Sequence, residues 1–282
     1  MPEKLDAPAL QVKILLYERS DSFSHYHVDI LHRLLEAGHV ASFARKSLID
    51  LGMDVKRVAN YTSKMSADAW VVTAGSRDLL QWFAQQQTPA FALAGRRQGV
   101  QIAATGPDKK PALRNAVRRL ITLGHRRIVM LAREIRRKPK PGGFEQTFLD
   151  ELTAQGIPCG DYNLPHWDDN EEGFHRCLDR LFSHTPPTAL IVGEMPLFIA
   201  AREHLAQMGI LAPRDVSMVC DDPHPAFDWC RPSIAHIHWD STHWSRRIVQ
   251  WADNVALGKK HRRQSFTKAT FIDGRTIGPV PD

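Results

Sequence analysis

Short apolar runs alternate with segments of helical spacing along most of the chain. The runs that predict strands lie at 12–17, 70–73, 90–93, 100–103, 127–132, 188–192, 215–219, 234–238 and 266–271. The segments that predict helices lie at 29–37, 77–86, 144–155, 171–183, 195–208 and 241–256. A further helix is expected between Asp108, as its cap, and Gly124. Buried strands that alternate with amphipathic helices indicate an α/β fold with parallel sheets.

The number of predicted strands exceeds what one small sheet needs, so we expect two doubly wound parallel-sheet lobes. The predicted division is a tail at 1–10, a first lobe at 11–132 with about 239–265, and a second lobe at 133–238 with about 266–282. The stretch 136–143 is rich in Pro, Gly and Lys and is the predicted crossover between the lobes.

Composition excludes several classes of protein. The chain is 43% hydrophobic and 24% charged, as in ordinary globular proteins. No run approaches the roughly 18 apolar residues that span a bilayer, and residues 1–10 lack the pattern of a signal peptide. We therefore expect a cytoplasmic protein without membrane contact. The four cysteines and fourteen histidines show no metal-ligand spacing, so we expect reduced thiols and no bound metal.

The net charge of +6 has a local origin. Segment 109–140 holds twelve basic residues and one acid, Glu134. Such an excess invites a nucleic-acid interpretation. However, the segment passes from a predicted surface helix through a buried strand to the crossover, so it need not form one groove. A solvated basic face is the simpler interpretation. The alternative is an anionic ligand near the residues Arg136, Arg137, Lys138 and Lys140.

Five segments, in order over about 11–280, resemble signatures of the LacI/GalR family of transcriptional regulators. They are 120–128 (LITLGHRRI), 187–192 (PTALIV), 209–219 (GILAPRDVSMV), the spacing of Asp221-Asp222 to Pro232, and 275–279 (RTIGP). The Trp70-Val-Val pattern followed by Trp82-Phe83 looks closest to a subgroup whose DNA-binding head is a GntR-type winged helix.

The resemblance implies the effector-binding core of a regulator, with the periplasmic-binding-protein type I fold. In that fold two lobes are joined by three crossovers and hold a small sugar-like ligand between them, with no cofactor. It also implies a homodimer. DNA would be bound only by a head domain, which we expect to lie outside this chain because about ten residues precede the first predicted strand.

Two other classes of function are alternatives to a regulator. A stand-alone cytoplasmic carbohydrate-binding protein without DNA-binding output is the alternative to a regulator. An enzyme is disfavoured because the sequence has no GxSxG, HExxH, P-loop or GxGxxG motif.

Four candidate ligand contacts follow from the resemblance in the second lobe. Asp222 follows a predicted strand, where a carboxylate can accept hydrogen bonds from sugar hydroxyls, and a helix-cap or turn aspartate is the alternative. Trp167 stands where the family often stacks an aromatic ring on a sugar, although a core tryptophan is equally consistent. Lys140 replaces the family's arginine, and Glu194 replaces its Asn or Asp. Pro111 replaces an acid that the family often carries, so that contact is either lost or moved to Asp108, and the pocket departs from that of familiar sugar binders.

The remaining candidates are Trp239 beside a crossover, Phe23 and Tyr26 in the loop 20–26, and Ser76 after the strand 70–73. Core packing is the alternative for Trp239, and a helix-capping loop is the alternative for 20–26. The dimer interface has two candidate apolar faces, which are otherwise lobe core. They comprise Ile30, Leu31 and Leu34, and Leu79, Leu80, Trp82 and Phe83.

Overall fold

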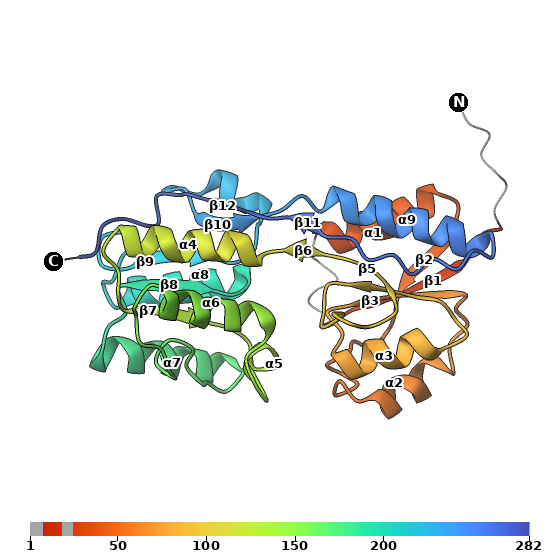
Figure 1. The fold of residues 1–282 in the computed structure, drawn as a ribbon, viewed down its shortest axis with the longest axis horizontal. Helices are drawn as coiled ribbons and strands as arrows, with labels where there is room; N and C mark the ends of the chain where they lie inside the picture. The colour runs from red at the N-terminus through yellow and green to blue at the C-terminus, as the bar shows by residue number, and fades with distance from the viewer. Residues whose placement is uncertain (1–7, 19–24, 282) are drawn as a thin grey trace. The chain divides into compact units, whose positions relative to one another are not determined.

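The computed structural model describes residues 8–18 and 25–281 (Figure 1). The chain divides into two compact units, one of Met1–Pro107 with Asp240–Thr267 and the other of Asp108–Trp239 with Lys268–Asp282. Each unit has its own five-stranded sheet, as the alternation of apolar runs and helices predicts. Two short strands, β6 (Pro107–Asp108) and β11 (Thr267–Lys268), fall at the boundaries between the units.

The predicted division between residues 132 and 133 is wrong. The first crossover falls at Pro107, and residues 108–132 belong to the second unit. The reason is strand pairing, because β7 (Ile128–Leu131) is the edge strand of the second sheet and pairs with β8 (Ala189–Val192).

The first unit has a sheet of order β2-β1-β3-β4-β5 in which every strand pair is parallel. Its strands are β1 (Gln11–Leu15), β2 (Val40–Phe43), β3 (Ala69–Thr73), β4 (Ala90–Leu93) and β5 (Ala103–Thr105). Its helices are α1 (His25–Glu36), α2 (Val55–Thr62), α3 (Arg77–Gln85) and α9 (Thr242–Ala256). The apolar pattern did not predict β2, because this edge strand has no fully buried residue.

The two apolar faces proposed for dimerisation belong mainly to the core of this unit. Ile30 and Leu34 of α1 are buried, and α1 packs on α9. Leu79, Leu80 and Phe83 of α3 are buried in one cluster with strands β3 and β4. These side chains therefore stabilise the unit itself.

The second unit has a sheet of order β12-β10-β9-β8-β7. The strands not yet given are β9 (Ser217–Cys220), β10 (Ala235–His238) and β12 (Thr270–Ile272). The helices are α4 (Lys110–Thr122), α5 (Glu134–Arg137), α6 (Gly143–Ala154), α7 (Glu171–His184), α8 (Met195–Gln207) and the 3-10 helix η2 (Pro225–Trp229). The sheet is parallel except at β12, which runs antiparallel to β10.

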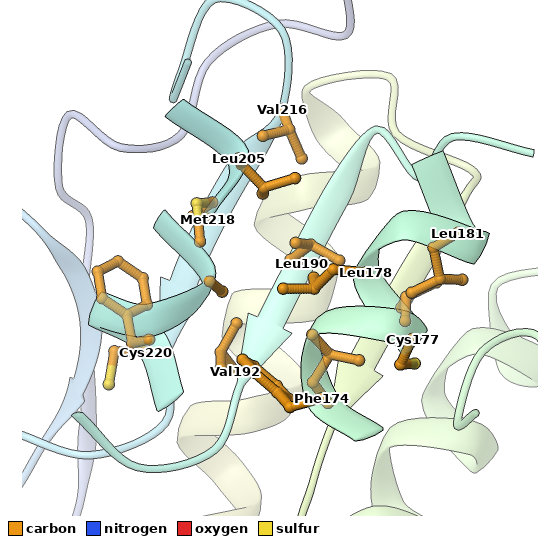
Figure 2. Packing of buried hydrophobic residues seen from close by; sticks show 14 of the residues in the cluster. Phe174, Cys177, Leu178, Leu181, Leu190, Val192, Leu205, Val216, Met218 and Cys220 are labelled. Atoms are coloured by element: carbon orange, nitrogen blue, oxygen red, sulfur yellow. The ribbon is translucent and has the colours of Figure 1, made fainter. Parts of the chain in front are cut away.

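Period-two alternation along β8 and β9 separates the two faces of this sheet. Leu190 and Val192 of β8 and Met218 of β9 face α7 and α8. Figure 2 shows Leu190 and Val192 near Leu178 and Phe174 of α7, and Met218 near Leu205 of α8. Alternate residues such as Ile191 and Val219 are equally buried but belong to the other face. Helix α4 packs on α6 and contacts β10 and β12. Strands β7, β8 and β9 are buried throughout, so polar side chains that reach a ligand lie beyond their ends.

Helix α4 does not begin as predicted. Lys109 is its N-cap residue, and the side chain of Lys109 makes no capping hydrogen bond. Asp108 is exposed and lies one residue too far upstream to cap the helix. In the described ranges, no helix has both the length and the apolar character needed to cross a membrane.

Thr276 should contribute strongly to the stability of the second unit. Its fully buried hydroxyl accepts a hydrogen bond from the Ala235 amide at 2.9 Å and donates one to the Met218 carbonyl at 2.7 Å. We expect Thr276→Val to lower the free energy of unfolding by about 2–3 kcal/mol, because two buried backbone groups lose a partner. Urea denaturation measures this, with exposed Thr122→Val as the control, expected within about 0.5 kcal/mol of the wild type. An equal loss of unfolding free energy in Thr276→Val and Thr122→Val would contradict this role.

Candidate functional site

Three neighbouring parallel strands of the second unit end at the same edge of the sheet. Leu131 of β7, Val192 of β8 and Cys220 of β9 lie in register. The ladder continues by one residue, since the amide of Gly193 donates to Leu131 and that of Asp221 donates to Val192. The residues that follow these strands are therefore gathered at one edge, where open α/β sheets bind ligands.

Asp221 is the centre of a charged cluster at this edge. Its side chain is 0% exposed and accepts hydrogen bonds from Lys109 Nζ at 3.0 Å and from Arg136 Nη2 at 2.7 Å. Burial alone would raise the pKa of Asp221, but the positive charges of Arg136 and Lys109 outweigh it and hold the pKa well below its usual range. Arg136 also donates to the buried Glu145 of α6, with 2.6 Å between Nε and Oε1. Asp221 and Glu145 thus fix the guanidinium from two sides.

Asp222 is oriented by the same lysine but is more accessible. Its Oδ1 accepts a hydrogen bond from Lys109 Nζ at 2.8 Å, and its side chain is 31% exposed. Its Oδ2 accepts no hydrogen bond from the residues that the structure describes. Burial raises the pKa of Asp222, the charge of Lys109 lowers it, and the neighbouring Asp221 carboxylate raises it. One carboxylate oxygen is therefore left for an external donor.

Glu194 presents a second carboxylate directly after β8. Its Oε2 lies 3.2 Å from Nε of Arg133, whose Nη1 lies 3.1 Å from Asp169, and the Glu194 side chain is 32% exposed. The backbone of Glu194 has a φ of +68°, an unfavourable conformation for a residue with a Cβ. This strained turn lies directly beside the cluster.

Two aromatic rings complete the cluster. Nζ of Lys109 lies 4.8 Å from the ring centre of Phe144 and 4.9 Å from that of Trp239. The guanidinium of Arg136 lies 5.2 Å from the Phe144 ring. Cations within about 6 Å of a ring face are attracted by its quadrupole, so the rings hold both cations in place.

The structure brings three of the predicted ligand contacts together, namely Asp222, Glu194 and Trp239. Trp167 lies in the core of the same unit, where it packs on Phe174 and the Arg137 guanidinium stacks on its ring. The core alternative therefore describes Trp167, and its ring face is not left for a sugar. Lys140 is exposed and makes no ion pair in the part of the chain that the structure describes.

The other predicted contacts are in or near the first unit. Ser76 is the N-cap residue of α3, and its hydroxyl accepts a hydrogen bond from the Leu79 amide at 3.3 Å. Tyr26 is half-buried in α1 and packs edge-on against Trp244, with 5.4 Å between ring centres. Both side chains thus have structural roles. Phe23 lies outside the described residues.

The basic residues of the stretch 136–140, which lies inside the second unit and is not the predicted crossover, do not form a free anion site. Arg136 is held by Asp221 and Glu145. The buried Arg137 donates to the carbonyls of Ala132 and Trp167, and Lys138 pairs with Glu134. Three of the four cations proposed to attract an anionic ligand are therefore already engaged within the protein.

Sequence reasoning missed Lys109 and Arg133, and it named Arg136 only as a candidate contact of an anionic ligand. Lys109 stood only at the start of a predicted helix, and Arg133 stood within a basic run. Their positions after a strand or before a helix gave no indication of a specific carboxylate partner. Asp221 was noted for its spacing, but only its complete burial reveals it as the centre of the cluster.

The cluster offers hydrogen-bond acceptors rather than catalytic groups. No set of three His, Cys, Asp or Glu side chains among residues 8–18 and 25–281 is arranged to hold a metal ion. Burial raises the pKa of the Cys220 thiol well above its usual value, and the nearby Asp222 and Asp221 raise it further, so this cysteine is a poor nucleophile. The arrangement is suited to binding a ligand with several hydroxyl donors.

The protonation of Glu194 should make stability depend on pH. Burial, together with the negative charges of Asp222 and Asp221, raises the pKa of Glu194 to about 7, against the opposing effect of Arg133 and Arg136. In the unfolded chain Glu194 loses this proton near its ordinary pKa of 4.5, so raising the pH from there to about 7 favours unfolding. Over this pH range the free energy of unfolding of the wild type should fall by about 1–2 kcal/mol relative to that of Glu194→Gln, after allowance for partial exposure. Urea denaturation across the range measures this, and a constant difference would contradict the assignment.

Comparison with known proteins agrees with this architecture. Residues 117–277, more than half of the chain, match the model of the periplasmic binding protein-like domain family. The HTH-type transcriptional repressor PurR of Erwinia tasmaniensis is 26% identical over 172 residues, which are 59% of this chain and 49% of that protein. The chain thus spans about half the length of this relative.

Solved structures share the fold at low sequence identity. A LacI family transcriptional regulator from Enterococcus faecium with bound ribose has a TM-score of 0.75 at 16% identity, covering 95% of this chain and 99% of that chain. A lac repressor dimer bound to operator has a TM-score of 0.76 at 16% identity, covering 97% of this chain and 96% of that chain. On the family match and this shared two-sheet fold, the chain belongs to the periplasmic binding protein-like domain family.

Proposed function

We propose that this chain is the effector-sensing core of a LacI-type transcriptional regulator and that it binds a small sugar-like ligand. The observation that carries the proposal is the pair of accessible carboxylates at the ends of β8 and β9. Asp222 Oδ2 and the Oε1 atom of Glu194 accept no hydrogen bond from described residues, whereas their partner oxygens are held by Lys109 and Arg133. A carboxylate fixed at one oxygen presents the other in a defined direction to a hydroxyl donor.

The charges favour a neutral ligand over an anionic one. A sugar acid or sugar phosphate would need free cations, but Lys109, Arg133 and Arg136 are all paired with carboxylates. Hydroxyl groups can donate to Asp222 and Glu194 without breaking these pairs. The ribose named for the Enterococcus faecium regulator is consistent with such a ligand.

The regulatory part of the proposal concerns the assembled protein in the cytoplasm. The lac repressor relative is named as a dimer bound to operator, and we propose that this chain also dimerises and reaches DNA through a separate head domain. A GntR-type winged helix is the specific head suggested by the sequence pattern. Reading the genomic DNA upstream of the codon for Met1 tests this point, since an in-frame helix-turn-helix or winged helix would support it.

Calorimetric titration against a panel of sugars tests the ligand. The panel pairs neutral pentoses and hexoses with their acid and phosphate derivatives. We expect at least one neutral sugar to bind, and its acidic derivative to bind more weakly. Absence of binding by any sugar would count against the proposal. Tighter binding of an acidic derivative would instead support the hypothesis of an anionic ligand.

A further inference from the structure

The ammonium group of Lys109 lies inside the cluster, between carboxylates and aromatic rings. Its ammonium lies 3.0 Å from Asp221 Oδ1 and 2.8 Å from Asp222 Oδ1, and its side chain is 15% exposed. The ring centres of Phe144 and Trp239 lie within 5 Å of the same nitrogen, at 4.8 and 4.9 Å. Two carboxylates and two ring faces therefore surround one primary ammonium.

These four side chains come from separate parts of the second unit. Asp221 and Asp222 follow β9, Phe144 lies in the first turn of α6, and Trp239 follows β10. None of them is a neighbour of Lys109 in the sequence, so the arrangement is built by the fold. Paired carboxylates with aromatic faces are the usual means by which proteins recognise an ammonium group.

We propose that Asp221, Asp222, Phe144 and Trp239 form an ammonium pocket, which the chain fills with its own Lys109. Lys109 is then a specificity-determining residue of the proposed ligand site. It occupies the place that a primary amine of a ligand would take and leaves only the outer carboxylate oxygens of Asp222 and Glu194 for hydroxyl donors. This consequence for ligand choice rests on the proposed function, whereas the pocket itself does not.

Because Lys109 is part of the chain itself, it can exclude a free amine from the ammonium pocket effectively. A group attached beside its binding pocket acts at an effective concentration in the millimolar range or higher. Lys109 directly precedes α4, which is anchored by the buried residues Leu113, Val117 and Leu120, so the ammonium is delivered from a fixed backbone. A free amine at lower concentration cannot compete with it.

Removal of the lysine side chain should open the pocket to a soluble amine. Lys109→Ala leaves the space of three carbons and an ammonium, which propylammonium matches. Lys109→Met is the control, because it fills the space with an uncharged chain of similar length. Tetramethylammonium is the second control, because it supplies the same charge but no N–H donor.

Thermal unfolding of the full chain is the measurement. We expect propylammonium to raise the Tm of Lys109→Ala by about 2–4 °C at roughly fivefold excess over its Kd. The wild type and Lys109→Met should respond no more to propylammonium than to tetramethylammonium. An equal response of all three proteins would overturn the proposal.

A failure to fold would still be informative. If Lys109→Ala is recovered folded only with propylammonium, and not with tetramethylammonium, the pocket is supported. If neither cation restores folding of Lys109→Ala or of Lys109→Ser, the proposal is overturned. No sugar enters these measurements, so a chain that binds no sugar but shows the amine response would refute the proposed function and leave the ammonium pocket standing.

Discussion

Arg136→Met is expected to lower the free energy of unfolding by about 3–5 kcal/mol, because it leaves buried carboxylates without their partner. Arg136 is the shared donor to Asp221 and Glu145, whose side chains are 0% and 3% exposed. Lys109 still faces Asp221 in the variant, but Glu145 loses its only ion pair among the described residues. Urea denaturation with an unchanged m-value measures the loss.

Arg119→Met is the matched control for this prediction. Arg119 pairs with Asp273 in the same unit at 2.8 Å, but the two side chains are 42% and 49% exposed. Exposed pairs contribute about 0–1 kcal/mol, so this variant should remain close to the wild type. If Arg136→Met and Arg119→Met lost the same small amount of unfolding free energy, Arg136 would not hold the site together.

Asp222→Asn is expected to weaken binding of the best sugar of the panel by about 10–100-fold, the usual contribution of a hydrogen bond to a charged group. Of the two polar atoms of the new amide, only the oxygen can accept the hydrogen bond that Lys109 donates at this position. The amide NH₂ then occupies the position of Oδ2 and faces the ligand hydroxyl with a donor. Isothermal calorimetry measures the affinity, and thermal unfolding checks that the variant is folded.

Asp273→Asn is the control for the loss of a carboxylate from the second unit. Asp273 is half-exposed and pairs with Arg119, away from the charged cluster. We expect it to bind the sugar as the wild type does. Wild-type affinity in Asp222→Asn would show that the ligand does not contact this carboxylate.

The fold was largely predictable because its signal is local. Buried parallel strands are continuous apolar runs, and helices such as α7 and α8 repeat apolar residues at helical spacing. The resemblance to the LacI/GalR family located Asp222 and Glu194, and both follow predicted strands, whose ends lie at the edge of the sheet. The edge strand β2 escaped prediction because its side chains are only partly buried.

The partners of these carboxylates were not predictable, because they depend on contacts between distant segments. Lys109 is separated from Asp221 by 112 positions, and Arg136 is separated from it by 85. Nothing local distinguishes Lys109 from the other basic residues between 109 and 140, and the sequence placed Arg136 only in a group of four basic residues without a carboxylate partner. Trp167 illustrates the same limit, since a core tryptophan and a sugar-stacking tryptophan have the same sequence signal.

The crystal structure of the chain with its best sugar tests the central claim most directly. We predict sugar hydroxyl oxygens within about 2.5–3.2 Å of Asp222 Oδ2 and of the Glu194 carboxylate, with Lys109 still between Asp221 and Asp222. A sugar bound elsewhere on the chain, with both of these carboxylates left free, would contradict it.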